Sequence, residues 1–168
     1  KLTALGLKIN EELCWDNLSV VLDKAKKYDN FVRMDMEDSK VTDLTIRMCQ
    51  RAKTYYSKCG TVLQSYMRRT IDDIDSLNTL NANIRICKGA YKENKDIAYQ
   101  DYHKIRQNYL DCAEKIMDNK IYIALATHDE WIIEKLLNLI ENKQYKKNMY
   151  EFQALSGVPI DKILDNLL

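Results

Sequence analysis

The sequence lacks the charge excess and the long apolar runs that mark several large classes of protein. Its 26 Lys and Arg residues are balanced by 25 Asp and Glu residues, which leaves a formal net charge of +1. A phosphate backbone needs a concentrated basic surface, so this balance argues against a nucleic-acid partner. No signal peptide is recognisable, and no apolar run approaches the length that spans a bilayer.

Paired cysteines are also lacking. The five cysteines are widely spaced, and no CxxC pair is present to bind zinc or to exchange disulfides. We therefore expect buried or half-buried thiols in a reducing compartment, which predicts a cytoplasmic protein. The cysteines are Cys14, Cys49, Cys59, Cys87 and Cys112.

Glycine and proline are scarce, with four and one residues respectively. No glycine-rich GxGxxG turn follows the first predicted strand, which argues against a Rossmann-type nucleotide site. Gly60 follows a predicted helix, where it is expected to end that helix. Pro159 is expected to open the last helix, because a proline costs little at that position.

Short apolar runs alternate with longer amphipathic segments along the chain. Strands are predicted at residues 1–7, 31–36, 61–66, 83–88, 121–126 and 150–155. Stripes of helical period run through residues 14–25, 44–55, 98–116 and 133–140. Strands that are separated by helices cannot pair as hairpins, so a parallel sheet is predicted, either a closed barrel or an open doubly wound sheet.

Unusual polar residues gather at the ends of the predicted strands, where a parallel barrel has its active site. They include Asp35, Glu37, Gln64, Arg85, Lys88, Thr127, His128 and Gln153. Charged groups inside strands are costly unless they pair with each other or with a ligand. One interpretation is an ion pair between Asp35 and Arg85 that only closes the barrel; a ligand site with both signs of charge is the other.

Two kinds of chemistry fit such a site. A metal hydrolase could use Asp35, Glu37, His128 and Asp129 as ligands, but no HxH pair is present and His103 is expected on the surface. Asp129 with Glu130 also fits the opening turn of the next helix. An anionic cofactor could instead bind Arg85, Lys88 and the small Gly89–Ala90 pair.

Six segments of the chain resemble, in order, the motifs of the proline dehydrogenases, particularly the bacterial monofunctional type. The segments are KLTALG at 1–6, VRMDMEDS at 32–39, LQSY at 63–66 with RT at 69–70, RICKGAY at 85–91, ATHD at 126–129, and EFQ at 151–153 with GV at 157–158. The resemblance covers essentially the whole chain, and each motif stands at the end of a predicted strand.

The resemblance implies a partial (β/α)₈ barrel, made of strands two to seven, in which residues 1–168 form a single catalytic domain. It implies an FAD enzyme that oxidises L-proline to Δ¹-pyrroline-5-carboxylate and passes electrons to a membrane quinone. Peripheral association at the inner face of the bacterial membrane would follow.

By motif, the resemblance also implies site roles. Asp35 would lie near the substrate amine and Arg85 against the flavin ring, while Lys1 and Tyr91 would bind the substrate. The FAD contacts would be Met36, Gln64, Arg85, Lys88, Gly89, Ala90, Thr127, His128 and Gln153, with no metal.

The family's last strand and helix, with an arginine pair and a tyrosine for the substrate, are expected beyond Leu168, and its first strand before Lys1. We therefore expect the 168-residue chain alone to self-associate and to turn over no proline, because two sheet edges would be open. A metal-dependent barrel hydrolase or lyase, or an inactive barrel fragment, remain the alternatives.

Overall fold

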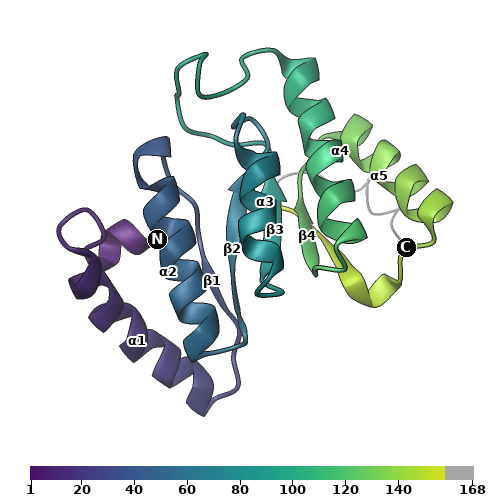
Figure 1. Cartoon of the computed structure of the whole chain (residues 1–168). Coiled ribbons are helices and arrows are strands. Elements are labelled where there is room, and N and C mark those ends of the chain that lie inside the picture. The colour runs from purple at the N-terminus through teal and green to yellow at the C-terminus, as the bar shows by residue number, and fades with distance from the viewer. Residues whose placement is uncertain (158–168) are drawn as a thin grey trace.

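The computed structural model of the chain describes residues 1–157, and the helix predicted to open at Pro159 lies outside them. Five parallel strands form one sheet in the order β1-β2-β3-β4-β5 (Figure 1). The strands are β1 (Val32–Met34), β2 (Cys59–Gln64), β3 (Asn83–Cys87), β4 (Ile123–Ala126) and β5 (Tyr150–Gln153). Five of the six predicted strands are thereby confirmed, with ends that differ by a few residues.

One long helix precedes β1, and the other long helices connect the strands. They are α1 (Glu11–Lys27), α2 (Thr42–Tyr55), α3 (Thr70–Asn78), α4 (Tyr102–Asp118) and α5 (Glu130–Lys143), with the short 3₁₀ helices η1 (Leu2–Leu5), η2 (Ser39–Val41) and η3 (Lys147–Met149). Three of the long helices begin at side-chain caps: Asn10, Asp101 and Asp129 accept a hydrogen bond from the backbone N–H three residues later. Such caps satisfy backbone donors that the first helical turn leaves free.

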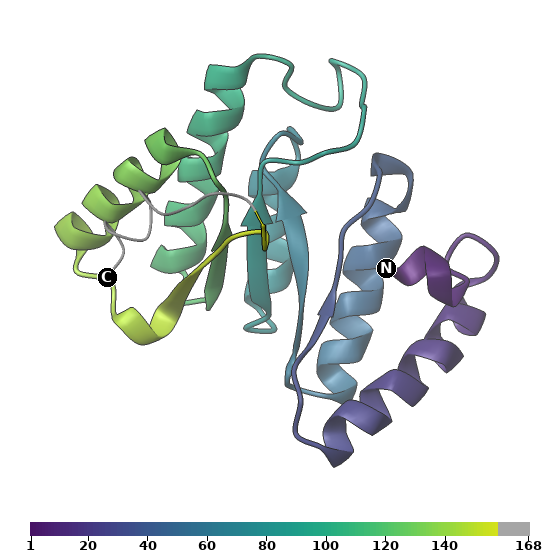
Figure 2. The same cartoon turned by 180° about the vertical axis from the view of Figure 1, so that it is seen from behind.

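Helices α2 to α5 cover one face of the sheet. Figure 1 shows them in front of the strands, and Figure 2, from behind, shows the strands in front. A doubly wound sheet has helices on both faces and a strand order that reverses, whereas a barrel is wound in one direction. The sequential strand order and the one-sided helices therefore confirm the fold class, a partial (β/α)₈ barrel.

The two faces of the sheet differ in polarity, as strand β3 shows. Ile84 and Ile86 are fully buried toward the helices, where the Tyr109 hydroxyl donates to the Ile86 carbonyl at 3.1 Å. Asn83, Arg85 and Cys87 alternate with them and are only partly buried. The apolar core thus lies between sheet and helices, and the other face is left for polar side chains.

The strand predicted at residues 1–7 is wrong. Leu2–Leu5 forms η1, and Gly6, at φ 98°, turns the chain so that Leu7 N–H bonds back to the Leu2 carbonyl. The spacing of three puts Leu2 and Leu5 on one face of a 3₁₀ turn, whereas a strand would point them to opposite faces, and both pack against the core, Leu2 buried and Leu5 half-buried.

The prediction that Gly60 ends a helix is wrong. Gly60 lies inside β2. A β-carbon there would come within 2.0 Å of the Asn83 carbonyl oxygen, so glycine permits the close approach of β2 to β3. Three members of the predicted apolar stripes, Val21, Tyr55 and Tyr102, are more than two-fifths exposed. The expectation for the cysteines is confirmed: four are buried and Cys87 is half-buried, and all five are free thiols.

Candidate cofactor and substrate site

The carboxyl ends of the strands surround an open hollow of about 1230 Å³. All twelve residues that the family motifs assign to a site line it: Lys1, Asp35, Met36, Gln64, Arg85, Lys88, Gly89, Ala90, Tyr91, Thr127, His128 and Gln153. Parallel strands bring their carboxyl ends to the same edge of the sheet, so residues far apart in sequence meet there. Its volume exceeds the roughly 300–1,000 Å³ that is usual for small-molecule sites.

Arg85 lies across the floor of this hollow. Its Nη1 donates to the Asp35 carboxylate at 3.2 Å and its Nε donates to Gln153 Oε1 at 2.7 Å. Asp35, after β1, and Gln153, on β5, therefore fix the plane of the guanidinium group. The ion pair considered from the sequence is therefore present. It is not sealed in a core, because the side chains of Arg85 and Asp35 are 32% and 47% exposed. Both can face a ligand.

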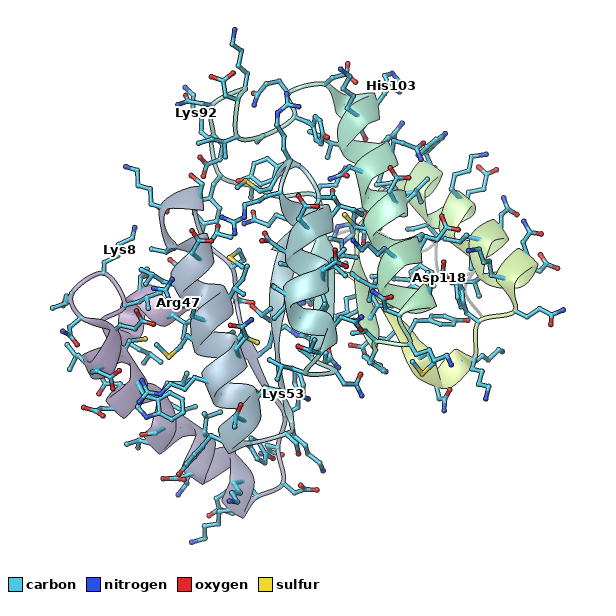
Figure 3. All side chains as sticks on the ribbon, viewed as in Figure 1. Lys8, Arg47, Lys53, Lys92, His103 and Asp118 are labelled. Carbon is cyan, nitrogen blue, oxygen red and sulfur yellow. The ribbon has the colours of Figure 1, made fainter. Side chains whose placement is uncertain are left out.

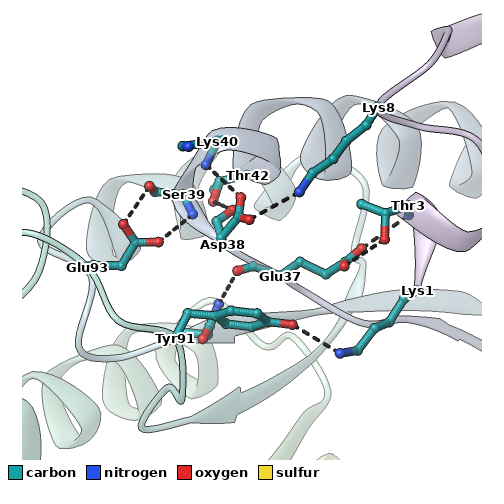
Figure 4. A network of polar contacts seen from close by, with 11 residues as sticks. Lys1, Thr3, Lys8, Glu37, Asp38, Ser39, Lys40, Thr42, Tyr91 and Glu93 are labelled. Carbon is teal, nitrogen blue, oxygen red and sulfur yellow. Dashed lines mark hydrogen bonds and ion pairs between the residues drawn. The ribbon is translucent and has the colours of Figure 1, made fainter.

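Lys1 and Tyr91 meet at the mouth of the hollow. Lys1 Nζ donates to the Tyr91 hydroxyl oxygen at 3.0 Å (Figure 4). This hydrogen bond and nearby Glu37 and Asp35 raise the pKa of the Lys1 ammonium. Since Tyr91 accepts from Lys1, its hydroxyl hydrogen remains able to donate to another group. The pair can therefore offer both a cation and a neutral donor to a carboxylate.

Asp129, three residues after the end of β4, accepts from side chains of two segments, the loop after β3 and helix α4. Lys88 Nζ donates to it at 3.0 Å, the Tyr102 hydroxyl at 2.7 Å, and Arg106 through Nε and Nη2 at 2.9 and 2.7 Å. These donors outweigh the desolvation of the carboxylate and hold its pKa well below its usual range. Asp129 also caps α5, as predicted, by accepting from Ile132 N–H.

Two neighbours of Asp129 complete the end of β4. Thr127 Oγ1 accepts from the Asp129 N–H at 3.1 Å, and His128 Nε2 accepts from the Leu155 N–H at 3.0 Å. The His128 imidazole therefore carries its proton on Nδ1 when neutral. The contact joins the segment after β5 to the segment after β4, and both line the hollow.

Gly89 has a structural reason for its identity besides its place in the hollow. Its φ is 112°, and a β-carbon would lie 2.3 Å from the Tyr66 ring. Tyr66 thus fills the space beside Gly89. The missing side chain of Gly89 lets the loop after β3 pack against the Tyr66 ring. Glycine is required here for the backbone conformation and for the close contact.

Sequence reasoning missed part of the wall. Tyr102, Arg106 and Trp131 line the hollow from α4 and α5, and the Arg106 guanidinium lies 4.1 Å from the centre of the Tyr102 ring and 5.2 Å from that of Trp131. Tyr102 and Arg106 are four residues apart and so share a helix face. That spacing is common in exposed helices, so it gave no specific signal for a site.

A reactive thiol, a metal cluster or a membrane-spanning helix among the described residues would also indicate a function. Cys87 also lines the hollow, but burial raises its pKa to about 11, so its thiol is protonated near neutral pH. His103 projects from the surface of α4, as expected (Figure 3). Residues 1–157 hold no cluster of three or more His, Cys, Asp or Glu side chains arranged for a metal ion. No helix in this part of the chain is long and apolar enough to cross a bilayer.

A family model described as proline dehydrogenase matches residues 2–165. Proline dehydrogenase 2 of Bacillus subtilis is 35% identical over 158 residues, which are 94% of this chain and 52% of that protein. Proline dehydrogenase of Deinococcus radiodurans is 36% identical over 153 residues, 90% of this chain and 49% of that protein. The chain therefore spans about half the length of these curated relatives.

Solved structures share the fold. One is the crystal structure of proline utilization A from Bdellovibrio bacteriovorus inactivated by N-propargylglycine. The alignment covers 96% of this chain and 19% of that protein, with a TM-score of 0.85. The sequence identity is 24%, so this likeness concerns the arrangement of strands and helices.

Proposed function

The chain belongs to the proline dehydrogenase family, and from this premise we propose that residues 1–168 form part of a catalytic barrel that binds FAD and oxidises L-proline to Δ¹-pyrroline-5-carboxylate. One observation carries the proposal beyond the family membership. The twelve motif residues come from segments far apart in the sequence, yet they line one hollow at the carboxyl ends of the strands.

The charges around the hollow suit the substrate. L-proline carries a carboxylate and a ring amine, which need a cation and an anion a few ångströms apart. Lys1, with the Tyr91 hydroxyl, would bind the carboxylate, and its raised pKa keeps the ammonium charged. Asp35 would face the amine, where a half-exposed carboxylate can hold the ring and accept a proton.

The donor set of the floor suits a flavin. Arg85 uses Nε and Nη1 for Gln153 and Asp35, while Nη2 has no hydrogen-bond partner within residues 1–157. FAD, when bound, supplies the acceptor for the hydride that leaves the ring carbon beside nitrogen. The fixed Arg85 cation would favour the reduced, anionic form of the ring.

The remaining contacts would come from groups around the hollow. Lys88 offers a cation to phosphate, while its bond to Asp129 sets its direction. The other proposed FAD contacts are Met36, Gln64, Gly89, Ala90, Thr127, His128 and Gln153. A membrane quinone as electron acceptor, and work at the inner face of the membrane, are parts of the proposal that rest on the family resemblance alone.

Turnover by the full-length protein tests the proposal. With L-proline and a soluble quinone, we expect the wild-type protein to release the cyclic imine product. Arg85→Gln should reduce turnover by at least tenfold, because it removes the fixed cation. Arg47→Gln is the matched control, since Arg47 lies on the exterior in an exposed pair with Glu11. A folded, flavin-loaded protein that forms no product would contradict the proposal.

A further inference from the structure

The mouth of the hollow is built from three segments that are remote in sequence. They are residues 1–5, which contain η1, the segment 35–39 after β1, and the loop 88–101 between β3 and α4. Figure 4 shows side-chain contacts that join each segment to the other two. Lys1 bonds to Tyr91, Thr3 to Glu37, and Ser39 to Glu93. We call this closed set of three contacts the clasp.

Glu37 joins η1 to the sheet. Its carboxylate accepts from the Thr3 backbone N–H at 3.1 Å and from Thr3 Oγ1 at 2.7 Å. Its own backbone carbonyl accepts from Gln64 Nε2 at 2.8 Å, at the end of β2. Glu37 is only 9% exposed, so these bonds are shielded from water. Leu2 holds η1 against the core and α1, and this carboxylate ties η1 to the segment after β1, so both fix where Lys1 lies.

Glu93 fixes the tip of the loop in the same way. Its two carboxylate oxygens accept from Ser39 N–H and Ser39 Oγ, both at 2.7 Å. The far end of the loop is held by backbone bonds, from Tyr99 N–H to the Tyr66 carbonyl and from Arg68 N–H to the Ile97 carbonyl.

Residues 90–93 make no backbone–backbone hydrogen bond within the described chain. Their position is held by the side-chain bonds of Tyr91 and Glu93, by Gln100 Nε2, which donates to the Glu93 carbonyl at 3.3 Å, and by the packing of Tyr91 against a small buried cluster that contains Tyr66. Because Tyr91 stands two residues before Glu93, the carboxylate of Glu93 contributes to where the Tyr91 ring lies.

We propose that Glu37 and Glu93 are positioning residues that hold Lys1 and Tyr91 together at the mouth of the hollow. The inference rests on the proposed function for its meaning, since Lys1 and Tyr91 are the groups proposed to bind the substrate carboxylate. Neither glutamate touches the reacting atoms in this account. Both carboxylates are already satisfied by paired donors, so they fix the geometry of the substrate site and leave the hydride transfer to other groups.

Variants at the Ser39–Glu93 contact test the proposal in the full-length protein. Glu93→Ala and Ser39→Ala should raise KM for L-proline roughly tenfold with little change in kcat, as expected when ground-state binding is lost with one charged hydrogen bond. They should also speed amide exchange at residues 88–93. Ser39→Thr keeps both donors and should restore KM. Asp96→Ala is the control, because Asp96 lies in the same loop, is exposed, and makes no side-chain hydrogen bond in residues 1–157.

The two readouts separate this inference from the proposed function. If the wild-type protein oxidises proline but Glu93→Ala and Ser39→Ala match Asp96→Ala in KM and in exchange, the clasp has no positioning role. If the wild-type protein does not oxidise proline, the proposed function fails, and exchange at residues 88–93 still reports whether the clasp orders the loop. Should Glu93→Ala fail to fold, Ser39→Ala, which removes one hydroxyl, decides the question.

Discussion

Among single residues, Asp129 connects α4, α5 and the loop after β3. Its side chain is 1% exposed and accepts from Lys88, Tyr102 and Arg106. Asp129→Asn would leave two cations beside a neutral amide, and we expect it to lower the free energy of unfolding by about 2–3 kcal/mol. Asp118→Asn is the control, since Asp118 is about half exposed and its pair with Lys143 should contribute at most about 0.5 kcal/mol. Equal losses in chemical denaturation would contradict the account.

The same residue predicts a pH dependence. Its pKa is lowered in the folded protein, so the stabilisation from its charged form is complete above the unfolded pKa of about 3.9 and is lost as the pH falls toward the folded value. The difference in unfolding free energy between wild type and Asp129→Asn should therefore be constant from about pH 5 to 7 and shrink below about pH 4. A difference that grows with acidity would be inconsistent with this sign.

Gly89 gives a second prediction at this scale. In Gly89→Ala the new β-carbon would meet the Tyr66 ring, in addition to the strain of a positive φ, so we expect a loss of about 2–4 kcal/mol in unfolding free energy. Gly157→Ala separates the two causes. Gly157 also has a positive φ, but a β-carbon there has no neighbour within 4 Å, so only about 1 kcal/mol should be lost. Similar melting temperatures for both variants would show that the contact is unimportant.

Site residues could be predicted where they stand in motifs at strand ends. Arg85, Lys88 and His128 follow from that pattern, because a parallel sheet places such residues on one edge. Arg106 and Trp131 could not, since their role depends on how α4 and α5 lie against the end of β4. The contacts of Glu37 and Glu93 could not be predicted either. They join segments that are far apart in the sequence and that come together only in the folded chain.

At the scale of elements, the closeness of β2 and β3 depends on Gly60. Gly60→Ala would place a β-carbon 2.0 Å from the Asn83 carbonyl oxygen. The two strands would have to separate, and we expect a loss of about 2–4 kcal/mol together with faster amide exchange in both strands. Substitution of Ala4 in η1 by glycine is a suitable reference, because Ala4 is exposed and far from this pairing. Unchanged exchange in β3 would be evidence against the tight approach.

Helices and strands could be predicted where the period of the apolar residues and the length of the segment both indicated the same kind of element. The five strands and the long helices carry sustained apolar patterns, and tertiary packing preserves them. The turn at residues 1–7 was not predictable, because Leu5 and Leu7 have the spacing of a strand while Leu2 and Leu5 have that of a 3₁₀ turn. The contacts with the core and with Glu37 select the 3₁₀ turn. The role of Gly60 could not be predicted, because it depends on contact with Asn83, which is 23 residues away in the sequence.

At the scale of the whole molecule, β1 and β5 each pair on one side only within residues 1–157. Two strand edges and the polar face of the sheet are therefore open within these described residues. We expect a polypeptide of residues 1–168 alone to self-associate, so that light scattering gives a mass above 19.8 kDa, and to turn over no proline. A monodisperse, cooperatively unfolding monomer that oxidises proline would contradict this expectation.

The central claim is that the hollow at the strand ends holds a flavin that L-proline reduces. Anaerobic titration of the purified full-length protein tests it most directly. We predict an oxidised flavin spectrum that bleaches on addition of L-proline and remains unchanged with a carboxylate that lacks the ring amine. A folded protein that binds no FAD, or one whose bound flavin stays oxidised in excess L-proline, would contradict the claim.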